Sequence, residues 1–184
     1  MFFCLNKDTN NKGFTLIEIM LSVALFSILI VAVLNIFHYS AKAHEKILNS
    51  QEILNQTSYI MEYMSRSIRM AQKDIDGDCS GATGKTYNSG DDSIKFINYD
   101  GFCQEFYLDG NILKQSIDDS TGVPLISSEF KVNLIKFEIL GDEIGDNIQP
   151  RITIFLDIES DTTDIDKQTQ VKIQTSVSQR NLDM

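Results

Sequence analysis

The chain has 184 residues, a length typical of one domain with at most a small appendage. It contains 16 Lys and Arg residues and 26 Asp and Glu residues, which gives a formal net charge of −10. This acidic balance disfavours the dispersed basic surface that binds a nucleic acid backbone and leaves only a local patch for that role, so we expect no direct nucleic acid partner. Apolar residues make up 42% of the chain, which excludes a disordered or collagen-like protein.

Few residues are suited to catalysis or metal binding. The chain has 2 His, 3 Cys and no Trp, so a Ser/His/Asp triad would have to use His38 or His44. We therefore expect a protein that is not an enzyme and that needs no cofactor and no metal.

One segment is almost free of charge. No charged residue occurs from Ile19 through Leu34, and the wider span from Phe14 to Phe37 contains only Glu18. A bilayer is crossed by roughly 20 helical residues at about 1.5 Å each, so this segment predicts a membrane span. The alternative is the core helix of a soluble protein, but nothing downstream is apolar enough to enclose it.

Thirteen mostly polar residues precede the apolar segment, and three kinds of N-terminus fit this arrangement: a secretory signal peptide, a plain membrane anchor and a prepilin-type leader. A signal peptide has a shorter apolar region followed by an A-x-A site. Ala41-Lys42-Ala43 offers that site, but the apolar segment is longer and has an acid near its start. Lysines flank the segment on both sides, so charge does not set its orientation.

The string Lys12-Gly13-Phe14-Thr15-Leu16-Ile17-Glu18-Ile19-Met20 distinguishes these alternatives. It resembles the N-terminal signature of type IV pilins and pseudopilins, in which glycine, an aromatic residue, a hydroxyl residue, two aliphatic residues and glutamate open the membrane segment. The resemblance implies that a prepilin peptidase cuts between Gly13 and Phe14 on the cytoplasmic face. It also implies that the peptidase methylates the new amine of Phe14.

Glu18 is the acid of this signature. An ionised carboxylate in hydrocarbon costs roughly 3 kcal/mol, so it normally has a partner or a role. Cleavage would create an amine on Phe14, about one helical turn away. The resemblance implies that Glu18 pairs with the amine of an adjacent subunit and sets axial register. The alternative is that Glu18 extends to the membrane interface, as in a generic anchor.

The leader would take Cys4 with it and leave Cys79 and Cys103. Both lie in the part expected outside the cytoplasm, where disulfides persist. A bond between them would close a loop of about 25 residues and stabilise the fold by roughly 3 kcal/mol. Free buried thiols are the alternative.

A helical pattern continues beyond the apolar segment, with no Pro or Gly between Phe14 and Lys73. About 60 residues would reach roughly 90 Å. The residues that recur at steps of three and four are Ile47, Ser50, Leu54, Thr57, Met61, Met64, Ile68 and Ala71. This stripe predicts that the second half of the helix packs on another layer.

An acidic, glycine-rich segment follows from Ile75 to Asp92. Asp74, Asp76 and Asp78 have the spacing that opens a calcium loop, but Cys79 stands where that motif needs Gly. We therefore expect a solvated acidic loop, with a calcium site as the alternative.

The period then changes to alternation, which predicts strands. The expected strands are Ser93 to Tyr99, Gln104 to Leu108, Ile112 to Ser116, Phe130 to Leu140, Arg151 to Ile158 and Gln170 to Ser178. Short polar turns, such as Asp100-Gly101, Asp109-Gly110-Asn111 and Asp161 to Lys167, favour an antiparallel meander. The fold class is thus α+β and pilin-like, with an antiparallel sheet, curved or split in two, covering the second half of the helix.

These patterns divide the chain into four parts. Residues 1–13 form a leader that is removed, 14–39 a transmembrane and filament-core helix, 40–73 its amphipathic continuation and 74–184 an extracytoplasmic head. The segments Tyr63 to Gln72 and Gln174 to Leu182 are similar to those of minor pilins and minor pseudopilins. Three arginines in or beside them, Arg66, Arg69 and Arg180, are expected to be ordinary surface charges, with an assembly contact or an anion patch as the alternative.

The resemblance implies a structural subunit, a minor pilin of a type IV pilus-like filament. Its partners would be prepilin peptidase, other pilin or pseudopilin subunits, an assembly platform and, before assembly, membrane lipid. The chain would sit in the cytoplasmic membrane with its leader inside and its head outside, and then in an extracytoplasmic filament. The alternatives are a minor pseudopilin of type II secretion or competence DNA uptake, and a membrane-anchored extracellular binding or enzymatic domain.

Overall fold

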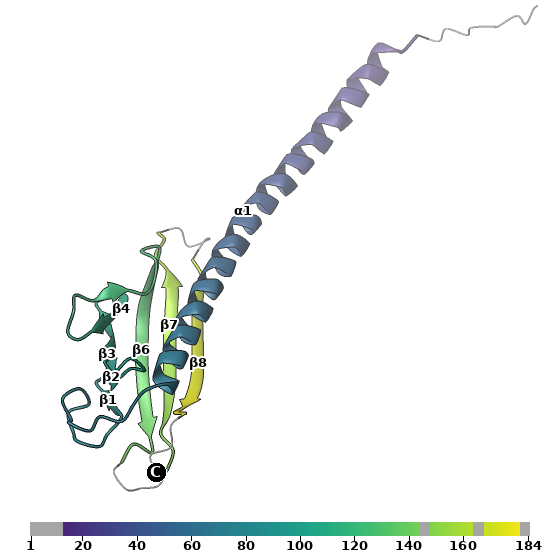
Figure 1. Ribbon diagram of the computed structural model, residues 1–184. Coiled ribbons are helices and arrows are strands. Elements are labelled where there is room, and N and C mark those ends of the chain that lie inside the picture. The colour runs from purple at the N-terminus through teal and green to yellow at the C-terminus, as the bar shows by residue number, and fades with distance from the viewer. Residues whose placement is uncertain (1–12, 144–147, 164–167, 181–184) are drawn as a thin grey trace, which may run out of the picture. The chain divides into compact units, whose positions relative to one another are not determined.

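The structure is a computed structural model that describes residues 13–143, 148–163 and 168–180. Most of the expected leader therefore lies outside the described residues. Within them, one long helix, α1 (Leu16–Arg69), is followed by strands alone (Figure 1). The contacts group the chain up to His44 into one unit and the chain from Glu45 onward into a second. The expected α+β class, with a long N-terminal helix before an antiparallel β-sheet head, is confirmed.

The strands form two antiparallel sheets. This agrees with one of the two expected forms, a sheet that is split in two. The first sheet has the order β1 (Tyr87–Ser89), β2 (Ser93–Ile97), β3 (Cys103–Asp109), β4 (Ile112–Ile117) and β5 (Val123–Pro124). The second has the order β6 (Phe130–Leu140), β7 (Arg151–Ser160) and β8 (Gln170–Ser178). Within each sheet, strands that are adjacent in sequence pair with one another, so each sheet is a meander.

Glycines make the tight turns of the first sheet. Gly101 between β2 and β3 has φ of 86°, and Gly110 between β3 and β4 has φ of 63°. These left-handed conformations are open to glycine at little cost, which explains the Asp-Gly pairs at these positions. The expected turn from Asp161 to Lys167 is described only as far as residue 163.

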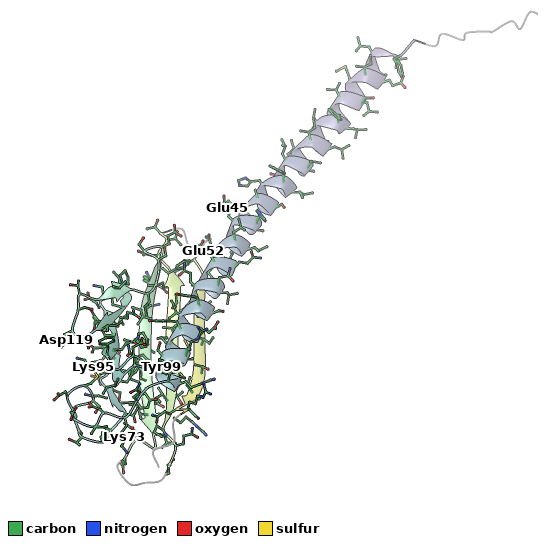
Figure 2. The ribbon with its side chains drawn as sticks, in the orientation of Figure 1. Glu45, Glu52, Lys73, Lys95, Tyr99 and Asp119 are labelled. Carbon is green, nitrogen blue, oxygen red and sulfur yellow. A yellow bond between two sulfur atoms is a disulfide. The ribbon has the colours of Figure 1, made fainter. Side chains whose placement is uncertain are left out.

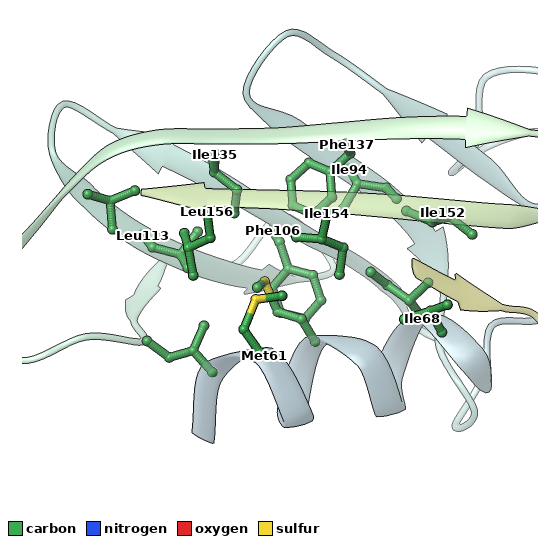
Figure 3. Close-up of a cluster of buried hydrophobic side chains, with 14 of the residues drawn as sticks. Met61, Ile68, Ile94, Phe106, Leu113, Ile135, Phe137, Ile152, Ile154 and Leu156 are labelled. Atoms are coloured by element: carbon green, nitrogen blue, oxygen red, sulfur yellow. The ribbon is translucent and has the colours of Figure 1, made fainter. Parts of the chain in front are cut away.

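The core lies between the second half of α1 and both sheets. The buried residues of α1 are Ile53, Thr57, Ile60, Met61, Met64 and Ile68. Figure 3 shows Met61 and Ile68 of α1 facing side chains of both sheets, among them Phe106 and Ile154. This spacing of three and four residues gives α1 one apolar face, which the sheets cover.

Part of the predicted stripe is wrong. Ile47 and Leu54 are 53% and 51% exposed, whereas Ile53 and Ile60, outside the stripe, are fully buried. The predicted positions 47, 54, 61 and 68 repeat every seven residues, and a straight helix drifts by about 20° per heptad. Counted back from the buried Ile68, the positions of this seven-residue repeat therefore rotate around the helix and no longer lie on the buried face at Leu54.

The helix also ends four residues before the predicted end at Lys73. Segments far away in the sequence satisfy its last carbonyl groups. Tyr87 Oη donates to the Ile68 carbonyl at 2.7 Å and the Arg180 N–H to the Arg69 carbonyl at 2.9 Å. Gln179 Nε2 donates to the Ala71 carbonyl at 3.1 Å. The bonds to Ile68 and Arg69 give partners to carbonyl groups at the end of α1, where intrahelical partners are lacking, and the bond to Ala71 holds the chain just beyond it.

Candidate processing and assembly site

The residues around the expected cleavage point form an open chain that leads into α1. A Cβ added at Gly13 would meet nothing within 4 Å, and Phe14 is 78% exposed. The bond between them is thus accessible in the structure. Gly13 and Phe14 lie directly before the helix, where a peptidase could bind an extended backbone.

Thr15 starts the helix. The Glu18 N–H donates to Thr15 Oγ1 at 3.3 Å and to the Thr15 carbonyl at 3.1 Å. A hydroxyl that accepts from the third residue of a helix is an N-cap, and Thr15 and Glu18 have the spacing of a capping box. This role of Thr15 was not among the predictions from the sequence, although the Thr-x-x-Glu spacing signals it.

Glu18 lies exposed in the first turn of α1. A carboxylate there interacts favourably with the positive end of the helix dipole. Its position, four residues after Phe14, gives a negative charge one turn from the N-terminus that cleavage would create. The arrangement can pair with a cation or with a hydrogen-bond donor from another molecule.

The first unit presents apolar side chains on every side of the helix. Figure 2 shows these side chains projecting outward from α1. The large exposed ones are Phe14, Leu16, Ile17, Ile19, Met20, Leu21, Val23, Leu25, Phe26, Ile28, Leu29, Ile30, Val31, Val33, Leu34, Ile36 and Phe37. Among the described residues, α1 is the one helix long and apolar enough to cross a membrane. So large an apolar surface needs lipid or other helices to cover it.

Two serine hydroxyls inside this apolar segment are satisfied within the helix. Ser22 Oγ donates to the Glu18 carbonyl at 2.7 Å, and Ser27 Oγ donates to the Val23 carbonyl at 2.8 Å. A hydroxyl bonded to the carbonyl four residues earlier needs no water. The two serines are therefore compatible with a hydrocarbon environment.

A disulfide joins Cys79, in the loop after α1, to Cys103 at the start of β3. It connects the two cysteines that sequence analysis paired. Both lie in the unit that begins at Glu45. The bond fixes the acidic loop to the first sheet.

Asp74 organises the same loop from within. Its buried carboxylate accepts from the Gly77 N–H at 2.8 Å, the Cys79 N–H at 2.9 Å, the Ser80 N–H at 2.7 Å and Ser80 Oγ at 3.0 Å. Burial raises the pKa of this carboxyl, but the bonds from Ser80, Gly77 and Cys79 together outweigh burial and hold the pKa below its usual value.

The expected alternative of a calcium loop is not supported by this geometry. The Asp74 oxygens already accept protein donors, while Asp76 and Asp78 are exposed. Within the described ranges, no group of three His, Cys, Asp or Glu side chains is placed to hold a metal ion. The role of Asp74 was missed because the Asp-x-x-Gly turn was interpreted as part of a calcium pattern.

The three arginines near the end of α1 take different positions. Arg66 pairs with Glu62 one turn earlier at 2.5 Å. Arg180 meets Arg69 through the backbone bond that caps the helix. Exposed pairs such as the first contribute little to stability.

Comparison with protein-family models matches residues 8–34 to the prokaryotic N-terminal methylation motif. This is the leader motif of type IV pilins and pseudopilins. The match ends within α1 and does not extend to the head. No curated protein and no solved structure matches the chain.

Proposed function

We propose that this chain, which carries the leader motif of type IV pilins and pseudopilins, is a structural subunit of a type IV pilus-like filament. The motif supports a pilin-like or pseudopilin subunit. Within that group we propose a minor pilin, on the similarity of residues 63–72 and 174–182 to minor subunits. A minor pseudopilin of a secretion or competence system shares the architecture and is the second candidate.

One observation carries this proposal. The match to the methylation motif ends in a helix whose first half exposes apolar side chains on all sides and whose second half packs in a head. An apolar helix of this kind is stable in lipid, and it is equally stable in a bundle of similar helices. The same surface can therefore serve as an anchor before assembly and as the filament core afterwards.

Processing prepares the subunit for assembly. Prepilin peptidase cleaves between Gly13 and Phe14 and methylates the Phe14 amine, which leaves a positive charge one turn from Glu18. In the assembled filament, the Glu18 carboxylate of one subunit pairs with the Phe14 amine of its neighbour. An ion pair within a layer of apolar helices is strongly favoured over an unpaired carboxylate, so the pair sets the axial register.

Replacing Glu18 tests this function. Glu18→Ala should leave cleavage intact, because the Gly13–Phe14 bond remains, but should lower incorporation into sheared filaments at least about tenfold, as expected for the loss of a pair in hydrocarbon. Immunoblotting of membrane and filament fractions measures both quantities.

Two controls accompany this variant. Gly13→Leu should accumulate as an unprocessed band, which shows that the assay resolves the leader. Glu45→Ala, on the same helix but in the second unit, should incorporate normally. Normal incorporation of Glu18→Ala would contradict the pairing, and an N-terminus at Met1 or His44 in the mature protein would contradict the whole proposal.

A further inference from the structure

The apolar part of α1 contains one polar side chain whose hydrogen-bonding groups are unsatisfied. Between Glu18 and His38, the polar side chains are those of Ser22, Ser27 and Asn35. Both serine hydroxyls donate to carbonyl groups of the helix itself. The Asn35 carboxamide, which offers two N–H donors and an acceptor oxygen, has no partner among the residues that the structure describes.

Asn35 lies inside the expected hydrocarbon layer. Residues 19–37 would extend about 28 Å at 1.5 Å per residue, close to the roughly 30 Å core of a bilayer. Asn35 precedes His38 by three residues, so it lies about 4.5 Å inside the C-terminal end of this span. Its Cα–Cβ bond tilts toward the N-terminus of the helix, and therefore toward the middle of the layer. So short a side chain cannot extend to the headgroups as a lysine can.

The amide of Asn35 selects one face of this helix for contact with another molecule. Large apolar side chains are exposed on all sides of the helix between residues 19 and 37, so apolarity alone favours no face. An amide turned toward lipid would keep its donors and its acceptor without partners, which is costly in hydrocarbon. Polar side chains of membrane helices therefore face other helices and form hydrogen bonds to them.

The face that contains Asn35 has the spacing of a parallel helix pair. Steps of three and four residues connect its members, as at the a and d positions of a seven-residue repeat. Ala24 is small and allows two backbones to approach closely. Glu18 lies beside this face and outside its a and d positions. The members, which we call the Asn35 face, are Leu21, Ala24, Ile28, Val31, Asn35 and His38.

We propose that the Asn35 face binds the same face of a second copy of the chain in the membrane. The two helices are parallel, and the two Asn35 carboxamides form hydrogen bonds to each other. The carboxamide is complementary to itself, because Nδ2 donates and Oδ1 accepts. A single asparagine in the seam between parallel helices also fixes their register.

A second copy is the partner that matches the depth of this amide. Copies inserted in the same orientation place residue 35 at the same depth, and a two-fold axis between them makes residue 35 meet residue 35. A helix of another protein would need its own polar group at that depth. The inference therefore depends on the membrane stage of the proposed function and not on the filament.

The pair precedes assembly, a step that rests on the proposed function. In the proposed filament, Glu18 of one copy meets the Phe14 amine of the next, so neighbouring helices are displaced by four residues, about 6 Å. Pairing of Asn35 with Asn35 requires helices at the same level and does not fit that displacement. The pair must therefore separate or slide when the helices enter the filament.

Two valines provide a matched cross-linking test. Val31 belongs to the Asn35 face, whereas Val33, two residues later, points to the opposite side of the helix, and the two are 59% and 62% exposed. Val31→Cys and Val33→Cys, each in the full chain with Cys4→Ser, are produced in a bacterial host without pilus genes. Copper phenanthroline oxidises the membranes, and a non-reducing gel separates the dimers. Val33→Cys should form at least about fivefold less dimer than Val31→Cys.

Variants of Asn35 identify the cause of the pairing. Asn35→Leu, added to Val31→Cys, removes the amide and should lower the dimer fraction about fivefold, as expected for the loss of a hydrogen bond between membrane helices. Asn35→Gln keeps an amide and should retain most of the dimer. Leucine makes the span more apolar, so the Asn35→Leu chain should still insert, which alkaline extraction of the membranes checks.

Four results would overturn the proposal. Equal dimer at the two valine positions would indicate random collision, and unchanged dimer in Asn35→Leu would show that the amide is not needed. Absence of dimer at both positions, or a cross-linked band of another mass, would exclude a second copy as the partner.

This measurement is independent of the filament assay. The host has no assembly machinery, so failure of the cross-linking test leaves the Glu18 result untouched. Conversely, normal incorporation of Glu18→Ala into filaments would contradict the filament register and leave the cross-linking result unchanged.

Discussion

Asp74 shows how a single carboxylate can hold a loop that is otherwise solvated. It lies just after the end of α1, and its oxygens bind three backbone N–H groups and one hydroxyl. Without Asp74, those buried donors would lack partners, at a cost of about 1–3 kcal/mol. The same turn carries Cys79 toward Cys103, so the carboxylate and the disulfide fix neighbouring parts of one loop.

Replacing Asp74 by Asn should therefore destabilise the head by about 1–3 kcal/mol at pH 7, because an amide offers one acceptor oxygen to donors that now use two. The pKa of Asp74 is lower in the folded protein than its ordinary value near 3.8, so ionisation of Asp74 stabilises the fold above about pH 3.8. This contribution is lost as the pH falls through the pKa that Asp74 has in the folded protein. The difference between wild type and variant should thus narrow below about pH 4. Urea unfolding at pH 7 and pH 3 measures it.

Asp76→Asn is the matched control for this measurement. Asp76 is exposed in the same loop, so its replacement should change stability by less than about 0.5 kcal/mol at either pH. A pH-independent difference for Asp74→Asn would mean that the variant acts through packing and not through the carboxylate charge.

At the scale of elements, the end of α1 is held by the end of β8. Gln179 is buried, its N–H donates to the Pro150 carbonyl at 3.0 Å and its side chain caps Ala71. This geometry gives Gln179 and Arg180 a structural role. They connect the last strand to the helix that the strand covers.

Gln179→Glu keeps the shape of the side chain but removes the donor to Ala71. At pH 7 a buried carboxylate would face a carbonyl oxygen, so we expect a loss of about 2–4 kcal/mol in unfolding free energy. Protonation restores a donor, and the folded-state pKa of this carboxyl should be raised, so the deficit relative to wild type should shrink as pH falls. Chemical denaturation between pH 4 and pH 8 follows the deficit.

The exposed Gln174→Glu on the same strand serves as control and should change stability by less than about 0.5 kcal/mol. If the deficit of Gln179→Glu stayed constant with pH, the capping bond would not be its cause.

The helices and strands could be predicted from the sequence where the spacing of apolar residues determines them. β6 and β8 match their predicted bounds, because long alternation at a core face specifies a strand. β1 and β5 were missed, since strands of 3 and 2 residues show no period and Pro124 argues against a strand. The helix end depends on bonds from distant segments, which no local pattern contains. The inner role of Asp74 depends on bonds from residues three to six positions later, in a turn that was interpreted as part of a calcium pattern.

At the scale of the molecule, the two units depend on different surroundings. Every residue of the buried hydrophobic cluster lies between Ile53 and Val177, within the unit that begins at Glu45. The first unit buries none of its large apolar side chains within the described chain. Stability of the head should thus be a property of the second unit alone.

A chain that begins at Glu45 should therefore be soluble and should unfold within about 2 °C of the midpoint of the full-length head, because the deleted residues contribute nothing to its core. Differential scanning calorimetry and gel filtration check this. A shortened chain that also lacks residues 45–56 removes Ile53 and is the control, with a midpoint at least about 4 °C lower. Aggregation of the first chain would show that the head needs the anchor.

The link between Cys79 and Cys103 also matters for load. When the head is pulled through α1 and unfolds, tension that reaches Cys79 along the chain is transmitted through the disulfide to Cys103 at the start of β3. The chain between the cysteines, a sequence separation of 24, is bypassed and cannot extend under force, which withholds about 80 Å of contour length. An unfolded head therefore extends less before a covalent bond breaks than the length of its backbone alone would allow.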